Sequence, residues 1–203
     1  MHRNILQIVL LLLLAHVAWA QTTSSVEAKR TPAPLDPNKF AVIINGAGGE
    51  AVYAKQFEEW TGQLSSVLSE RFGFDGKQVK ILTEKQATAE EVKRTFAALK
   101  SQLDANNILY VFLIGHGSFD GKESKFNLVG PDLSASEYNV LLSSLPTHRV
   151  VVFNMASASG EFVKSLAAKG RIVITATRNG QETNATRFTG FFIAALNAPD
   201  ADT

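Results

Sequence analysis

Five short apolar runs, spread over most of the chain, are the feature that most restricts its fold. The run NILYVFLIG at residues 107–115 is apolar almost throughout. A strand with apolar side chains on both faces must be covered on both sides, which is typical of parallel sheets. The five runs lie at residues 39–45, 78–83, 107–115, 149–154 and 171–177.

Amphipathic segments separate these runs. Apolar residues from Tyr53 to Leu68 recur at steps of three and four, as on one face of a helix. A segment at 116–133, rich in glycine and lysine, predicts a hairpin or loop, and residues 187–197 predict a final helix. This alternation predicts an α/β fold with a mostly parallel central sheet and helices on both faces. Two further helix starts are marked by capping boxes, Thr88 with Glu91 and Ser134 with Glu137.

The first residues have the pattern of a secretory signal peptide. His2 and Arg3 precede an apolar stretch that ends in Ala-Trp-Ala, so we expect cleavage after Ala20. The apolar stretch is shorter than the ~20 residues of a spanning helix, which argues against a stable membrane anchor. We therefore expect an exported protein, periplasmic or extracellular. Residues 1–20 form the signal peptide, 21–38 a flexible linker and 39–203 the domain.

Composition excludes several kinds of chemistry. The chain has no cysteine, so disulfides, thiolate metal sites and a thiol nucleophile are excluded. The formal net charge is +1 and no basic patch is evident, which argues against nucleic acid as a partner. We expect no metal and no cofactor, and the pattern leaves the oligomeric state open.

Small and polar residues follow the apolar runs. Open parallel sheets bind ligands beyond the carboxyl ends of their strands, so these residues form the candidate site. His116 lies between two glycines directly after the third run, whereas His148 precedes a strand and belongs to the opposite edge. His116 is either a functional imidazole or an ordinary turn residue. The strand ends are Asn45–Gly46 and residues 115–118, 154–160 and 175–177.

The glycine-rich turn after the first run has two interpretations. Gly46, Gly48 and Ala51 match a loose form of the dinucleotide fingerprint, between a strand and a helix. The acidic residue that should follow about 20 positions later is missing. A tight strand–helix turn explains the glycines at positions 46–49 equally well.

Three segments, taken in order, resemble the motif blocks of the legumain-like cysteine peptidases, family C13, which share the caspase fold with caspases and gingipains. The resemblance extends from about Lys39 to the C-terminus. It implies a three-layer, caspase-like α/β fold and a peptide or protein ligand. The segments are YVFLIGHGSFDG at 110–121, VVVFNMASASGEF at 150–162 and VITATRNGQETNATRF at 173–188.

The resemblance implies roles for residues at the strand ends. His116 stands at the position of the catalytic base, and Ser157 at that of the nucleophilic cysteine. The backbone N–H groups of Gly117 and Ser157 correspond to the oxyanion hole. The other residues that match the nucleophile motif are Ala156, Ser159 and Gly160.

Serine at position 157 predicts impaired catalysis. A thiol of pKa about 8.5 is readily ionised by a neighbouring imidazole, whereas a serine hydroxyl is far less acidic. Serine hydrolases therefore need a base that is itself supported, usually by a carboxylate. Asp120 is close to His116 in sequence, but the sequence does not tell whether its carboxylate reaches the imidazole.

The specificity pocket implied by the resemblance has also changed. Ala54 aligns with an arginine, and Met155 with an acidic residue, both of which contribute to the family's pocket for asparagine. The family's preference for cleavage after asparagine is therefore not expected here. The remaining pocket residues by resemblance are Asn45, Thr175, Ala176 and Thr177.

Three functions remain open from the sequence. The favoured one is an impaired peptidase homologue that serves as a peptide-binding or scaffold module. The second is an active hydrolase that uses Ser157 and His116, and the third is a nucleotide-binding protein that uses the glycine turn. The family continues beyond the motif at the end of this sequence with an acidic segment and another helix. A domain truncated at its C-terminus, without a sixth strand, is therefore one expectation.

Overall fold

The computed structural model describes residues 32–198. The expected signal peptide, residues 1–20, lies outside the described residues, so cleavage after Ala20 stays a prediction. Within the described part, every helix is too short or too polar to cross a membrane.

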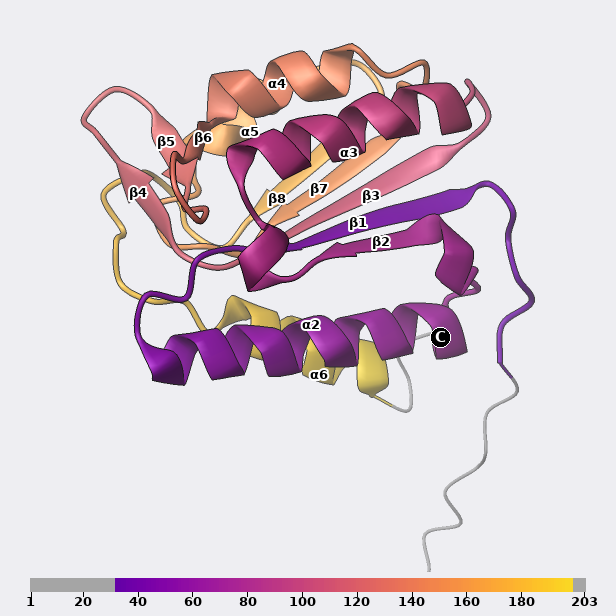
Figure 1. Ribbon diagram of the computed structural model, residues 1–203, viewed down its shortest axis with the longest axis horizontal. Coiled ribbons are helices and arrows are strands. Elements are labelled where there is room, and N and C mark those ends of the chain that lie inside the picture. The colour runs from indigo at the N-terminus through magenta and orange to yellow at the C-terminus, as the bar shows by residue number, and fades with distance from the viewer. Residues whose placement is uncertain (1–31, 199–203) are drawn as a thin grey trace, which may run out of the picture. The chain divides into compact units, whose positions relative to one another are not determined.

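A five-stranded parallel sheet forms the centre of the fold (Figure 1). The strand order is β2-β1-β3-β7-β8, and each neighbouring pair is parallel. Each strand coincides with one of the five apolar runs, which confirms the predicted parallel sheet. The strands are β1 (Lys39–Asn45), β2 (Val79–Leu82), β3 (Ile108–Ile114), β7 (Val150–Asn154) and β8 (Arg171–Thr175).

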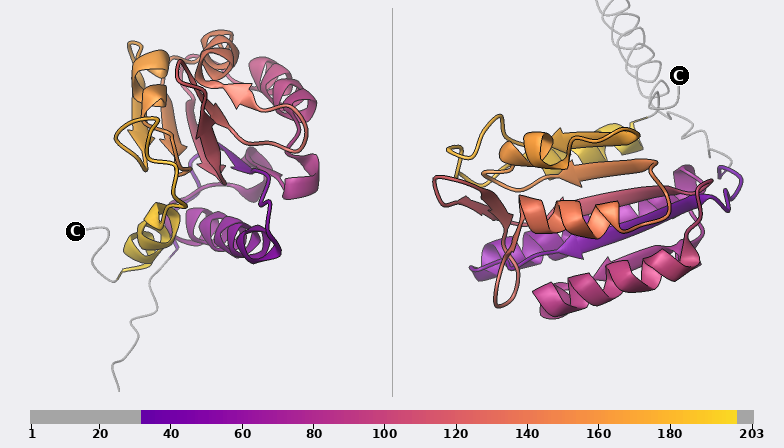
Figure 2. Two further views of the ribbon diagram at one scale, coloured as in Figure 1. Left: turned by 90° about the vertical axis from the view of Figure 1, so that its left-hand side faces the viewer. Right: turned by 90° about the horizontal axis from the view of Figure 1, so that it is seen from above.

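Helices cover both faces of this sheet, so the predicted three-layer α/β architecture is confirmed (Figures 1 and 2). Each face has its own apolar core: Phe96 and Leu109 belong to one, and Leu64 and Phe112 to the other. One face is covered by α3 (Ala89–Gln102), α4 (Ala135–Ser143) and α5 (Glu161–Leu166), and the other by α2 (Ala51–Arg71) and α6 (Phe188–Asn197).

Capping side chains set two of the helix starts. The Ser134 hydroxyl accepts from the Glu137 N–H, and the Glu137 carboxylate accepts from the Ser134 N–H, so this capping box is complete. Thr88 Oγ1 accepts from the Glu91 N–H at 3.2 Å. The Glu91 carboxylate, however, pairs with Arg94 rather than with the Thr88 backbone, so the second predicted box is only half formed.

A small antiparallel sheet follows β3, in the order β4-β5-β6. Its first two strands form the hairpin expected between residues 116 and 133. The three strands are β4 (Gly117–Phe119), β5 (Ser124–Phe126) and β6 (Leu133–Ser134). Figure 1 shows this sheet beyond the carboxyl ends of the central strands.

Hydrogen bonds tie the residues just before β1 to the domain. The Asp36 N–H donates to the Gly73 carbonyl at 2.8 Å, and the Gln78 side-chain amide donates to the Pro37 carbonyl at 2.8 Å. The folded part therefore begins before Lys39, the first residue of the expected domain.

Candidate functional site

His116 and Ser157 lie at the same edge of the sheet. They follow β3 and β7, which are adjacent and pair in parallel with Leu113 opposite Asn154. Neighbouring strands are about 4.8 Å apart, so the loops after them can contribute to one site. The structure therefore brings together the two residues that the sequence placed at the carboxyl edge.

The Ser157 hydroxyl is buried and fully engaged by backbone. The residue is only 2% exposed. Its Oγ accepts from the Gly117 N–H and donates to the Gly117 carbonyl, each at 3.1 Å. The hydroxyl proton is thus directed to a carbonyl oxygen and not to the His116 imidazole. In this arrangement Ser157 links the turn after β7 to the start of β4.

The His116 imidazole is held by aromatic rings of α2. It meets the Tyr53 ring edge-on, with centroids 4.9 Å apart, and the Phe57 ring at 5.0 Å. Within residues 32–198 the imidazole takes part in no hydrogen bond or ion pair. No carboxylate of the described chain therefore orients it as a general base.

Asp120 is bound within its own turn. Its carboxylate accepts from the backbone N–H groups of Lys122 and Glu123 and pairs with Lys125 Nζ at 3.0 Å. The Glu123 N–H bond, with the bond to Lys125, lowers the pKa of Asp120 to about 2. The one nearby carboxylate considered from the sequence thus supports the β4–β5 turn rather than His116.

The two expected oxyanion donors differ in their availability. The Gly117 N–H is already bonded to Ser157 Oγ. The Ser157 N–H has no protein partner among the described residues. Ala158, which follows, has φ 50°, a left-handed conformation uncommon outside glycine, and its N–H donates to the Glu182 carbonyl at 2.8 Å. Within the described chain, the Ser157 N–H is thus an unbonded backbone donor in a turn that is itself buried.

A buried hydrogen-bond network fixes the rest of this turn. The Ser159 and Thr177 hydroxyls lie 3.1 Å apart, and the Gly160 N–H donates to Thr177 Oγ1 at 3.1 Å. A Cβ on Gly160 would lie 2.3 Å from the Asn179 nitrogen. The Ser159–Gly160 pair of the motif is therefore accounted for by packing and hydrogen bonds of the fold.

The six pocket residues expected from the sequence do not line one pocket. Asn45 and Ala54 line a pocket of about 440 Å³ between the ends of β1 and β2 and the first turns of α2. Met155 is buried in the core, and the Ala176 N–H donates to the Asn154 carbonyl. Thr175 and Thr177 are hydrogen-bonded to each other within their own loop. The reason is that the loop after β8 folds onto the turn after β7 rather than towards β1.

The glycine turn after β1 is shaped by packing. A Cβ on Gly48 would lie 2.5 Å from the Ala54 Cα, and one on Gly46 would lie 2.4 Å from the Asn127 carbonyl oxygen. The Gly48 N–H donates to the Glu84 carboxylate at 2.7 Å. An acidic group thus occupies the place that a phosphate would need, which argues against nucleotide binding at this turn.

A pocket of about 510 Å³ between α2 and α6 was not expected from the sequence. One of the residues that line it is Tyr53, which also contacts His116. Tyr53 and Trp60 belong to the apolar face of α2, which the periodicity assigns simply to the core. We call this the α2–α6 pocket; its main residues are Tyr53, Gln56, Trp60, Thr186, Arg187, Gly190 and Phe191.

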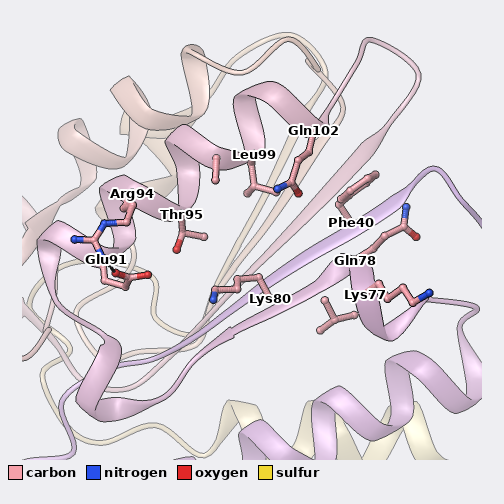
Figure 3. Close-up of a pocket in the computed structure, with 11 residues that line it drawn as sticks. Phe40, Lys77, Gln78, Lys80, Glu91, Arg94, Thr95, Leu99 and Gln102 are labelled. Atoms are coloured by element: carbon pink, nitrogen blue, oxygen red, sulfur yellow. Dashed lines mark hydrogen bonds and ion pairs between the residues drawn. The ribbon is translucent and has the colours of Figure 1, made fainter.

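Another pocket, of about 300 Å³, lies between α3 and β2 (Figure 3). Figure 3 shows Lys80 and Phe40 on the sheet below Thr95 and Leu99 of α3. Phe40 is near the amino end of β1, so this pocket is remote from His116 and Ser157. None of the candidate site residues lines it.

Comparisons with known proteins show which solved structures have a similar fold. No family model and no curated protein matches the chain. Among solved structures, caspase-1 from Spodoptera frugiperda superposes with a TM-score of 0.52 at 13% identity, covering 82% of this chain and 75% of that one. Raptor from Chaetomium thermophilum superposes with a TM-score of 0.50 at 11% identity, covering 84% of this chain and 18% of that one.

A third structure, protein GSU0716 from Geobacter sulfurreducens, has 22% identity and a TM-score of 0.47 over 63% of this chain. This chain spans 53% of that protein's length. At such identities the comparisons concern the fold alone. Together with the parallel sheet and its helices, the match to caspase-1 shows that this chain has a caspase-like fold.

Proposed function

We propose that this chain is an exported homologue of the legumain-like peptidases that binds peptide segments and cleaves them poorly or not at all. The observation that carries the proposal is the bonding of Ser157. Its hydroxyl occupies the nucleophile's place, but its proton is held by the Gly117 carbonyl at 3.1 Å.

The chemistry of the pair supports the loss of cleavage. Removing a proton from a serine hydroxyl needs a base within hydrogen-bond reach, which in turn is oriented by a third group. The imidazole of His116 is packed between Tyr53 and Phe57 and has no carboxylate partner in the described chain. Loss of a functioning nucleophile and base typically costs on the order of 10⁴-fold or more in rate.

Peptide binding does not need this chemistry. Extended peptides are bound through backbone donors and through pockets for side chains. The partly exposed His116 lies at this edge, and pockets flank Tyr53 and Ala54 on α2. The sheet edge therefore retains features for binding in the absence of an efficient nucleophile.

Turnover of a fluorescence-quenched peptide library by the purified wild-type chain, Ser157→Ala and Ser157→Cys tests the proposal. We expect wild type to cleave no faster than Ser157→Ala, because neither has an ionisable nucleophile. Ser157→Cys should exceed both by about tenfold or more, because a thiolate forms far more readily at neutral pH. The gain should disappear when His116→Ala is combined with Ser157→Cys.

Two results would contradict the proposal. Robust wild-type cleavage that is abolished by Ser157→Ala would make the chain an active serine peptidase. Failure of every peptide of the library to bind wild type, in a fluorescence anisotropy assay, would remove the peptide-binding function. Urea unfolding of each variant provides the control for folding.

A further inference from the structure

The α2–α6 pocket combines an aromatic wall with an open rim. Phe191 is 64% exposed although it is a large apolar side chain, and the partly exposed Tyr53 and Trp60 stand across from it on α2. The two helices approach closely here, because a Cβ on Gly190 would lie 3.3 Å from the Trp60 ring. The pocket thus offers aromatic surface that a large apolar side chain can bury.

The rim of the pocket carries a positive charge. Arg187 is the one charged residue among those that line it. Its guanidinium lies 5.4 Å from the centre of the Phe191 ring and makes no ion pair within residues 32–198. Arg187 also precedes α6, whose first turn has neither a side-chain cap nor an acidic residue. A carboxylate at this rim would therefore meet a guanidinium that has no carboxylate partner in the described chain, and the positive end of a helix.

The pocket lies next to the candidate site and shares contacts with it. Tyr53 contributes its ring to the pocket and contacts His116 with centroids 4.9 Å apart. Thr186, another lining residue, donates its hydroxyl to the carbonyl of Met155, which precedes the turn of Ser157. A peptide bound beside the partly exposed His116 can therefore place a neighbouring side chain in the α2–α6 pocket.

We propose that the α2–α6 pocket selects peptide segments in which an aromatic or large aliphatic side chain stands next to a carboxylate. The inference rests on the proposed function, because it names the class of peptide that the site takes. The carboxylate belongs either to an acidic side chain or to a free C-terminus, since both offer the same group to Arg187.

Binding of four labelled peptides to the full chain, followed by fluorescence anisotropy, tests this selection. The first two carry phenylalanine followed by aspartate, or phenylalanine at a free C-terminal carboxylate. The other two carry phenylalanine followed by asparagine, or alanine followed by aspartate, both with amidated ends. We expect both peptides that combine phenylalanine with a carboxylate to bind more tightly than the amidated asparagine and alanine peptides, and their ranking identifies the preferred source of the carboxylate.

Substitutions in the pocket test its aromatic wall and its positive charge separately. Ala194 lines the pocket at an exposed position of α6, so Ala194→Phe fills the pocket. It should lower the affinity for the phenylalanine peptides about tenfold, because it excludes their apolar side chain. Ala195→Phe, at the next exposed position outside the lining, is the matched control. Arg187→Gln should lower the affinity only for the peptides with a carboxylate, about threefold. Arg178→Gln, outside the pocket, should leave the affinity unchanged.

Trp60 provides an independent signal, because it lies in the pocket. Its emission should change when the phenylalanine–aspartate peptide binds, and the change should be lost in Trp60→Phe, which keeps an aromatic wall. Equal binding of all four peptides, or equal effects of Ala194→Phe and Ala195→Phe, would overturn the inference while leaving peptide binding itself intact. Cleavage by the wild type would contradict the impaired function and leave this test of selection unaffected.

Discussion

Thr177 saturates its hydrogen bonds in the turn that carries Ser157. Its hydroxyl donates to the Asn179 carbonyl, accepts from the Gly160 N–H and meets the Ser159 hydroxyl. Its own N–H donates to Ser159 Oγ at 3.2 Å. At the scale of single residues, the geometry around Ser157 thus depends on a threonine eighteen to twenty positions later in the chain.

Thr177→Val should therefore destabilise the fold. Valine keeps the shape but leaves the buried Gly160 N–H and Ser159 hydroxyl without their partner, which costs about 1–3 kcal/mol. Urea unfolding measures the loss. Thr183→Val, at an exposed position whose hydroxyl makes no hydrogen bond in the described part of the chain, should stay within about 0.5 kcal/mol of wild type. Equal effects of the two substitutions would show that the network contributes nothing.

The sequence predicted the positions of the candidate site residues better than it predicted their hydrogen bonds. The rule that ligand sites lie at carboxyl strand ends was enough to place His116 and Ser157 at one edge. The rule could not tell that Ser157 Oγ bonds Gly117, because that depends on the path of β4 to within an ångström. Nor could it tell that Asp120 turns towards Lys125, since the competing partners are all close in sequence.

At the scale of elements, a glycine at the start of one helix and a glycine inside another have opposite roles. Gly160, just before α5, has φ −56°, an ordinary helical value, so its lack of a side chain is required for space rather than for conformation. The Asn179 nitrogen would lie 2.3 Å from a Cβ there. A Cβ on Gly62, in the middle of α2, would meet no neighbouring atom within 4 Å.

The same substitution at these two sites should shift stability in opposite directions. Gly160→Ala should lower the free energy of unfolding by about 1–3 kcal/mol, because the loop after β8 must move away. Gly62→Ala should raise it by about 0.5–1 kcal/mol, because alanine is the better helix former. Chemical unfolding of both variants measures the difference. A loss of stability in Gly62→Ala would contradict the steric assignment.

Elements with strong periodicity were predictable, and the pocket between two of them was not. Apolar runs and capping residues located all five central strands and the starts of α3 and α4. The α2–α6 pocket depends instead on how closely two helices from opposite ends of the domain approach, and a Cβ on Gly190 would lie 3.3 Å from the Trp60 ring. Periodicity assigns Trp60 to a helix face but cannot tell whether that face is closed.

At the scale of the whole molecule, the two outer strands of the central sheet differ in their protection. Unpaired edge strands invite association with other chains, and lysine on an edge strand discourages it. On β2, Lys80 is exposed. On β8, whose outer side has no strand among the described residues, Ile172 is 58% exposed. Strand β8 is therefore the edge at which this fold is most open to association.

Exchanging the kinds of exposed side chain on β2 and β8 should reverse the tendency of these two edges to associate with other chains. Ile172→Lys should reduce concentration-dependent light scattering during refolding from urea, because a charge on β8 opposes strand addition, whereas Lys80→Ile should increase it. Both positions are exposed, so unfolding free energies should stay within about 0.5 kcal/mol of wild type. Val140→Lys, which makes the same kind of change at a 69% exposed site on α4, is the matched control. If Val140→Lys reduces scattering as much as Ile172→Lys, the effect comes from net charge and not from the edge of the sheet.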